Sequence, residues 1–169
     1  YYDGSKLNLE TGTLVSTKTG GNCALDPSNA RYTCTGYYTR KFSHYKSGRS
    51  GNLDGYFKEF RLAELYLNYA EAANEASTTG TVPNDAVDAV NTVRSRVGMP
   101  GIPYGLSCDQ FRLRVRNERR VELAFEEHRF FDVRRWKILD QTDKVVTGMK
   151  ANADGSYSRF VVDSDRRAY

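Results

Sequence analysis

The stretch FRLAELYLNYAEAANE (residues 60–75) decides the fold class, because its apolar side chains recur at the spacing of a helix. Two sets lie three or four positions apart: Phe60, Ala63, Leu67 and Ala70, and Leu62, Leu65, Tyr66, Tyr69 and Ala73. Together they predict a wide apolar stripe, with Glu64, Glu71 and Glu75 on the polar side. We therefore predict an amphipathic helix that ends within residues 77–80.

A second helix is predicted in NDAVDAVNTVRSRVGMP (residues 84–100), after a short polar loop. Asn84 is a candidate N-cap, and Gly98 followed by Pro100 is typical of a helix end. One face is apolar: Ala86, Val90, Val93 and Val97. The two helices predict an antiparallel hairpin. Because such a pair cannot cover its own apolar stripe, we expect further helices to pack on it, mainly from upstream of this chain.

The third helical segment spans residues 107–139 and is rich in charge. Ser107 and Gln110 have the spacing of a capping box. Two ion pairs are expected along the helix surface: Arg114 with Glu118, and Arg119 with Glu122. Because acidic residues share the segment with the arginines, we interpret it as an ion-paired helix over an aromatic core, and not as a DNA-reading helix.

Composition places the core in the middle of the chain. Of the 35 Leu, Ile, Val and Phe residues, 23 lie in residues 56–139. Beyond them, apolar residues 145–146 and 160–162 flank a turn at 152–155 and predict a β-hairpin.

The sequence contains no run of about 18 apolar residues that would span a bilayer. With 25 basic and 21 acidic residues, the net charge of +4 is too balanced for a dedicated nucleic-acid binder.

Three motifs occur in the order and spacing of a known family. FRLAELYLNYAEAANE (60–75), AVNTVRSRVGMP (89–100) and RNERRVELAFEEHRFFDVRRW (116–136) together resemble the SusD/RagB family, surface lipoproteins of Bacteroidetes that capture nutrients. YYTRKFSHY (37–45) is similar to the segment that precedes the first of these helices in the family. The chain departs from the family at Glu127, where many members carry Gly, and the resemblance implies that this exchange tightens or shifts a turn before His128.

The resemblance implies a mainly α fold of tetratricopeptide-like helix pairs, with a loop-rich face and a short β-hairpin. It also implies that the chain is the C-terminal portion of a longer SusD-like protein. That portion would consist of a loop-rich segment (1–55), a helical centre (56–139), and the hairpin with the tail (140–169).

The same resemblance implies a function in nutrient uptake. Family members bind glycans at the surface of the outer membrane and hand them to a SusC-like TonB-dependent transporter. Their N-terminal lipid anchor would lie upstream of Tyr1. The resemblance implies no cofactor and no nucleic-acid partner. A helical-repeat adaptor that binds a protein or peptide is the alternative, and a lipobox Cys in the upstream sequence would distinguish the two.

The sequence offers little catalytic machinery. A nucleophilic triad needs a base, and only His44 and His128 are available. His128 and Asp132 have helical spacing, but the sequence has no third metal ligand at matching spacing. We interpret His128 as a structural hydrogen-bonding residue, and Trp136 as a packing residue whose indole N–H finds an acceptor. The sequence therefore predicts a binding protein and not an enzyme, without a metal or cofactor.

The candidate ligand contacts are tyrosines in the first third of the chain: Tyr32, Tyr37, Tyr38 and Tyr45. Sugars present C–H faces that stack on aromatic rings, although packing within loops and strands is the alternative role of each tyrosine. Cys23 and Cys34 are a candidate disulfide, because an exported protein meets an oxidising compartment. Two thiols are the alternative. Cys108 is expected to stay unpaired in the first turn of the third helix.

Overall fold

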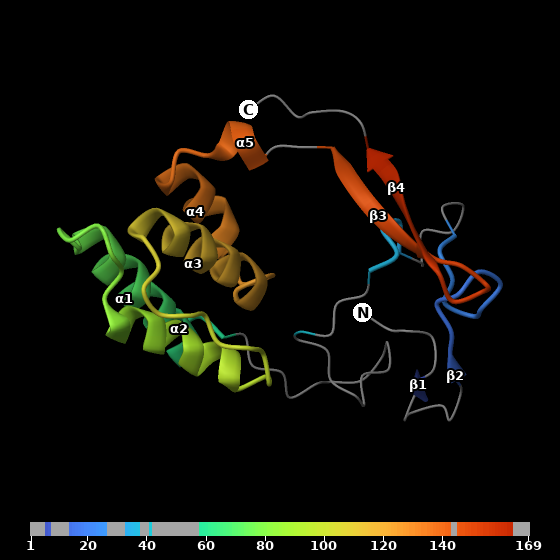
Figure 1. The fold of residues 1–169 in the computed structure, drawn as a ribbon. Coiled ribbons are helices and arrows are strands. Elements are labelled where there is room, and N and C mark those ends of the chain that lie inside the picture. Colours follow the sequence, from blue (N-terminus) through green and yellow to red (C-terminus); the bar gives the residue numbers. More distant parts are fainter. Residues whose placement is uncertain are drawn as a thin grey trace. The chain divides into compact units, whose positions relative to one another are not determined.

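The structure is a computed structural model that describes residues 6–7, 14–26, 33–37, 41, 58–142 and 145–163. The chain falls into two compact units, which are treated separately: residues 58–137, and residues 1–57 together with 138–169. Figure 1 shows the helices of the first unit and the β-hairpin of the second. Within the described ranges, no helix has both the length and the apolar character needed to cross a membrane.

Residues 58–137 form the helical unit. Its helices are α1 (Leu62–Ala76), α2 (Asn84–Ser95), α3 (Cys108–Glu122) and α4 (His128–Arg135). α1 packs against both α2 and α3 (Figure 1). The core lies where these three helices meet, and Leu67, Val90 and Phe111 are fully shielded from solvent there. The predicted mainly helical fold is confirmed.

The start of α3 matches the sequence signal, while both ends of α2 differ from it. Ser107 and Gln110 form the predicted capping box: Ser107 Oγ accepts the Gln110 N–H at 3.3 Å, and Gln110 Oε1 accepts the Ser107 N–H at 3.2 Å. At α2 the N-cap is Pro83, and Asn84 is already the first helical residue. Val97, expected on the apolar face of α2, lies beyond the end of the helix and is 56% exposed.

The third predicted segment is divided into α3, of 15 residues, and α4, of 8 residues, and is not one continuous helix. The chain turns between α3 and α4, where Phe125 and Glu127 both have a φ of 64°. This left-handed conformation cannot continue an α-helix, and it costs a residue with a Cβ about 1–2 kcal/mol. Glu127 thus adopts the backbone conformation that Gly favours, at the position where the resembled family often carries Gly. Because neither residue is a glycine, the helical pattern alone concealed the turn, and only the family resemblance placed one before His128.

Two glutamates that we assigned to the polar side of α1 are buried. Glu64 is 9% exposed and Glu71 is 8% exposed. Their partners come from beyond α1: His128 Nε2 lies 3.4 Å from Glu64 Oε2, and both Arg135 and Trp136 donate to Glu71. Buried carboxylates persist where such partners replace water. Both residues thus lie on the polar side of α1, as predicted, but that side faces α4 and not solvent.

The two ion pairs predicted along α3 are replaced by pairs between helices. Glu118 Oε2 accepts from Arg94 of α2 at 2.5 Å, and not from Arg114. Likewise, Arg119 donates to Asp132 of α4 at 3.0 Å. Packing partly removes these side chains from water, so a pair between helices is stronger than an exposed pair along one helix. The predicted local pairs were wrong for this reason.

The second unit contains the predicted β-hairpin. β3 (Val146–Ala151) and β4 (Tyr157–Asp163) pair in antiparallel fashion. The outer edge of β3 is partly covered, because Lys18 forms a parallel bridge with Ala151 and the Thr19 N–H donates to the Ala151 carbonyl at 2.9 Å. The remaining elements are β1 (Lys6–Leu7), β2 (Leu14–Val15) and α5 (Leu139–Thr142).

Candidate functional site

Of the four tyrosines predicted to contact ligand, the structure describes one. Tyr37 ends the segment 33–37, and its side chain is 49% exposed. Tyr32, Tyr38 and Tyr45 lie outside the described residues. The clustering of the four stays a prediction, and Tyr37 stays a candidate contact whose ring is accessible from solvent.

Main-chain contacts attach the segment 33–37 to the outer edge of β3. The Met149 N–H donates to the Thr35 carbonyl at 2.8 Å. Gly36 has a φ of 76°, and a Cβ there would stand 1.8 Å from the Met149 carbonyl oxygen, so only Gly fits. The Tyr37 N–H donates to Thr35 Oγ1 at 3.3 Å. Tyr37 is thereby held at a fixed place beside the hairpin.

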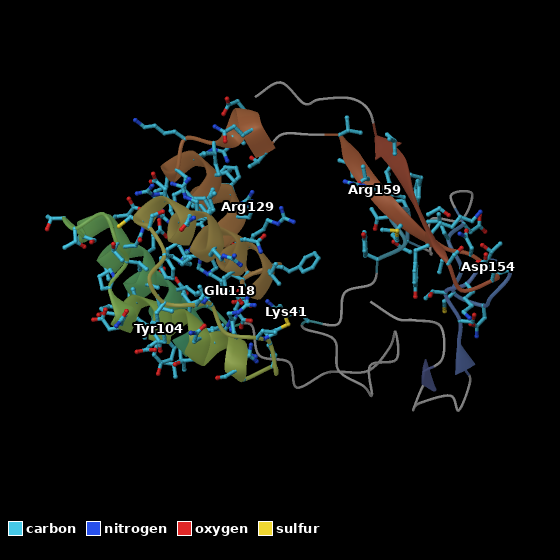
Figure 2. All side chains as sticks on the ribbon, in the orientation of Figure 1. Lys41, Tyr104, Glu118, Arg129, Asp154 and Arg159 are labelled. Atoms are coloured by element: carbon cyan, nitrogen blue, oxygen red, sulfur yellow. The ribbon has the colours of Figure 1, made fainter. Side chains whose placement is uncertain are left out.

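One face of the hairpin carries further groups suited to a sugar, which our sequence reasoning missed. The register pairs Met149 with Arg159 and Ala151 with Tyr157, so both β4 side chains share one face. Arg159, labelled in Figure 2, donates to Thr147 Oγ1 from Nε at 3.2 Å and from Nη2 at 3.1 Å. Tyr157 is 47% exposed. The alternation of side chains after the turn was the signal that could have found them.

The turn of the hairpin is stabilised by Asp154, which Figure 2 shows at its tip. Asp154 Oδ1 accepts the Ser156 hydroxyl at 2.7 Å and the Ser156 N–H at 2.9 Å. These two hydrogen bonds hold the pKa of Asp154 below its usual value, and the charge of Lys18 acts in the same direction. Asp154 is thus an ionised carboxylate that shapes the turn.

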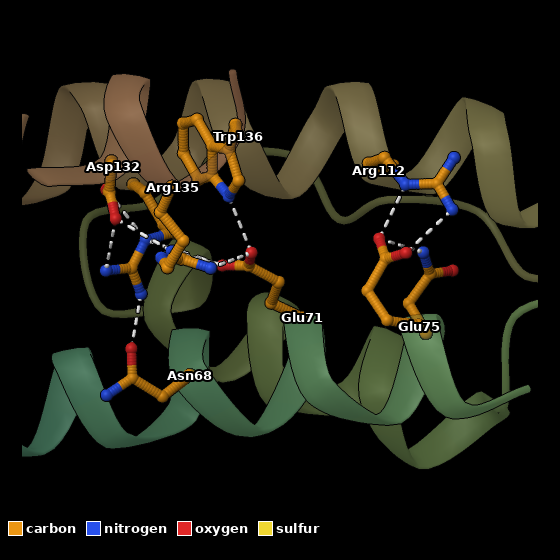
Figure 3. A network of polar contacts seen from close by, with 9 residues as sticks. Asn68, Glu71, Glu75, Arg112, Asp132, Arg135 and Trp136 are labelled. Atoms are coloured by element: carbon orange, nitrogen blue, oxygen red, sulfur yellow. Dashed lines mark hydrogen bonds and ion pairs between the residues drawn. The ribbon is translucent and has the colours of Figure 1, made fainter. Parts of the chain in front are cut away.

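A network of charges connects α1 with α3 and α4 (Figure 3). Glu71 of α1 accepts from Trp136 Nε1 at 2.6 Å and from Arg135 Nη2 at 3.0 Å. Asp132 accepts from Arg135 Nη2 at 2.8 Å and from Arg119 Nε at 3.0 Å. The carboxylates of Glu71 and Asp132 are buried together with Arg119 and Trp136, while the side chain of Arg135 is half exposed. The prediction that the Trp136 indole finds an acceptor is confirmed.

A hollow of about 370 Å³ opens beside this network. Its lining residues are Asn68, Glu71, Ala72, Glu75, Arg119 and Arg135. Hydrogen bonds from Arg112 at 2.5 and 2.8 Å hold the pKa of Glu75 below its usual value. The hydrogen bond to Glu71 raises the pKa of Arg135. Both shifts favour the charged forms, so neither group is poised for proton transfer near neutral pH.

His128 and the cysteines were singled out by sequence. His128 begins α4 and faces Glu64, in agreement with a structural role.

Cys108 is the first residue of α3, as predicted. All three cysteines are described and are thiols, so the structure does not contain the Cys23–Cys34 disulfide. That pairing stays a prediction, which mass spectrometry of non-reduced peptides tests. Among the described residues, no three His, Cys, Asp or Glu side chains are grouped to hold a metal.

Comparison with known sequences places the chain in one family. The model of the SusD family matches residues 3–168. SusD-like protein P25 of Formosa agariphila is 40% identical over 83 residues, which are 47% of this chain and 15% of that protein. SusD-like protein P2 of the same organism is 38% identical over 85 residues, which are 46% of this chain and 16% of that protein.

Solved structures share the fold over nearly the whole chain. A SusD-like protein of Bacteroides fragilis NCTC 9343 has a TM-score of 0.77 and 32% identity, over 99% of this chain and 32% of that one. A SusD-like carbohydrate-binding protein of the same strain has a TM-score of 0.72 and 25% identity, over 98% and 35%. The chain spans about a third of the length of these two proteins. Its sequence and its fold both show that the chain belongs to the SusD family.

Proposed function

We propose that the SusD-like protein of which this chain forms a part captures glycan nutrients at the bacterial cell surface. It hands them, without cleaving them, to a SusC-like TonB-dependent transporter in the outer membrane, where an N-terminal lipid outside this chain anchors it. The observation that carries the proposal is the family match over residues 3–168, together with a solved relative described as carbohydrate-binding.

In this proposal, the second unit, which contains the β3–β4 hairpin, supplies ligand contacts. The ring of Tyr37 is exposed, and the backbone beside it is already fixed to β3 through Thr35 and Gly36. A sugar that stacks on a fixed ring requires little additional ordering of the protein, which favours binding. On the hairpin itself, Tyr157 and Arg159 offer a second ring and a guanidinium for hydroxyl groups.

Capture without cleavage is supported by the charges of the described residues. A glycosidase needs a carboxyl group whose raised pKa keeps it protonated near neutral pH, beside a second carboxylate. The shifts resolved for carboxyl groups go the other way: the pKa values of Glu75 and Asp154 are lowered by hydrogen bonds from Arg112 and Ser156.

Calorimetry of the complete protein against a panel of glycans tests the proposal. We expect Tyr37→Ala to weaken binding several-fold, because stacking on one ring contributes on the order of 1 kcal/mol. Tyr37→Phe should retain most of the affinity. Tyr104→Ala is the matched control, since Tyr104 is an exposed tyrosine of the helical unit. Unchanged affinity in Tyr37→Ala would place the ligand face elsewhere.

Two further measurements separate the parts of the proposal. Chromatography of a bound glycan after long incubation should recover it intact, and shortened products would show catalysis. Co-purification from outer membranes should recover a TonB-dependent transporter with the protein. Binding of a peptide, with no glycan of the panel bound, would support the helical-repeat adaptor instead.

A further inference from the structure

Arg159 of β4 carries a positive charge that no carboxylate among the described residues neutralises. The side chain is exposed, and both of its hydrogen bonds go to the hydroxyl oxygen of Thr147, which is a neutral acceptor. The arginines of the helical unit differ in this respect, because Arg61, Arg94 and Arg119 each form an ion pair with a carboxylate. The charge of Arg159 is thus available to an anion from outside the chain.

The bonds to Thr147 orient the guanidinium of Arg159 and leave one of its edges open. Nε and Nη2 donate to Thr147 Oγ1 at 3.2 and 3.1 Å, so the edge between these two nitrogens is occupied. The edge between Nη1 and Nη2 presents a pair of parallel N–H groups, and none of the described residues accepts from that edge. Such a pair matches two oxygens of a carboxylate or of another oxyanion. Thr147 therefore holds Arg159 in an orientation suited to an anionic group.

The neighbours of Arg159 on this face of the hairpin suit a sugar that bears a charge. Tyr157 lies two positions earlier on β4, so its side chain stands on the same face at a spacing of roughly 7 Å. A sugar ring that stacks on Tyr157 can place a charged substituent at Arg159 across this spacing. Asp154, at the turn, is bound to Ser156 and is under the influence of the charge of Lys18, so it does not neutralise Arg159.

We infer that the glycan captured by the SusD-like protein is anionic, and that its carboxylate or sulfate group binds the Nη1–Nη2 edge of Arg159 while a sugar ring stacks on Tyr157. The inference rests on the proposed function, because it assigns a class of glycan to the same hairpin face. A hydrogen bond between two charged groups is about twice as strong as one between neutral groups. The charged substituent should therefore determine which glycans bind well.

Calorimetry of the complete protein with matched pairs of glycans tests the inference. One pair is an oligogalacturonate and its methyl ester, and the other is a sulfated galactan oligosaccharide and its desulfated form. In one of the pairs, which distinguishes carboxylate from sulfate, we expect the charged member to bind about tenfold more tightly than the neutral one. Equal affinities within both pairs, or binding of neutral glycans alone, would overturn the inference and leave glycan capture standing. Binding of no glycan at all would overturn both.

Substitution of Arg159 tests where the charged group binds. Arg159→Gln should weaken binding of the charged glycan about tenfold and change the affinity for its neutral counterpart little. Arg159→Lys should retain part of the affinity, because an ammonium keeps the charge but lacks the paired N–H groups. Arg114→Gln is the matched control, since it removes the same charge from an exposed arginine of α3. Equal effects of Arg159→Gln and Arg114→Gln would assign the selectivity to overall charge and contradict a site at Arg159.

Discussion

Glu127 has a backbone conformation that conflicts with its residue type, since its φ is 64° at the start of α4. We expect Glu127→Gly to raise the free energy of unfolding by about 1 kcal/mol, because Gly reaches this conformation without a Cβ clash. Urea denaturation of the complete protein measures the change. Glu127→Ala is the control, because it removes the same carboxylate but keeps the Cβ. Equal gains in both variants would assign the effect to charge instead.

Trp136 joins packing and hydrogen bonding in one side chain. It is 9% exposed, Arg116 stacks on its ring with 4.9 Å from the guanidinium carbon to the ring centroid, and its Nε1 donates to Glu71. Trp136→Ala should lower the free energy of unfolding by about 3–5 kcal/mol. Trp136→Phe keeps a ring but loses the bond to a buried carboxylate, at a cost of about 1.5–3 kcal/mol. Thermal denaturation that finds Trp136→Phe as stable as the natural protein would contradict the role of the bond.

At the scale of elements, double-mutant cycles can compare the coupling free energy of an ion pair between helices with that of a pair expected along one helix. A double-mutant cycle of Arg94→Ala and Glu118→Ala should give a coupling of about 1 kcal/mol, because the two side chains are in contact and partly buried. The same cycle with Arg114→Ala should give a coupling near zero. A larger coupling for Arg114 than for Arg94 would favour a pair along α3 over the pair between α2 and α3.

Local sequence signals predicted where the helices form better than they predicted which side chains pair between helices. The capping box at Ser107 depends on two residues three positions apart, and it formed as expected. The break at Phe125 and Glu127 was expected from the family resemblance alone and not from the helical pattern, because tertiary packing holds residues with a Cβ in a conformation that sequence rules assign to Gly. The burial of Glu71 could not be predicted locally, because its partners, Arg135 and Trp136, lie more than sixty positions away.

The candidate site was less predictable than the helices. Tyr37 was found from composition alone, but its fixed position depends on Gly36 and Met149, which are more than a hundred positions apart. Arg159 and Tyr157 were overlooked because a residue's place on one face of a hairpin follows from strand register. The sequence predicted the turn, but its apolar signal covered only residues 160–162, so positions 157 and 159 were not assigned to a face of the second strand.

At the scale of the whole molecule, many large apolar side chains among the described residues are exposed to solvent. Exposed large side chains of the helical unit beyond α1 include Leu113, Val121, Phe125, Phe130 and Phe131. We expect the chain expressed alone to bind a hydrophobic dye and to unfold with low cooperativity. Dye fluorescence and a thermal scan test this, with the complete protein as the control. Sharp unfolding without dye binding would contradict it.

The attachment of the segment 33–37 to β3 has a practical consequence. The Thr35 carbonyl and the Met149 N–H form the bond, so the joint depends on main-chain atoms and on the glycine at position 36. Because the Thr33 hydroxyl also accepts the Thr35 N–H at 3.2 Å, a library of variants should keep Thr33, Thr35 and Gly36 and randomise position 37, which then presents new side chains from the same backbone position. The hairpin could therefore serve as a protein-engineering scaffold: the exposed side chain of the attached segment can be varied, while the main-chain bond to β3 is retained.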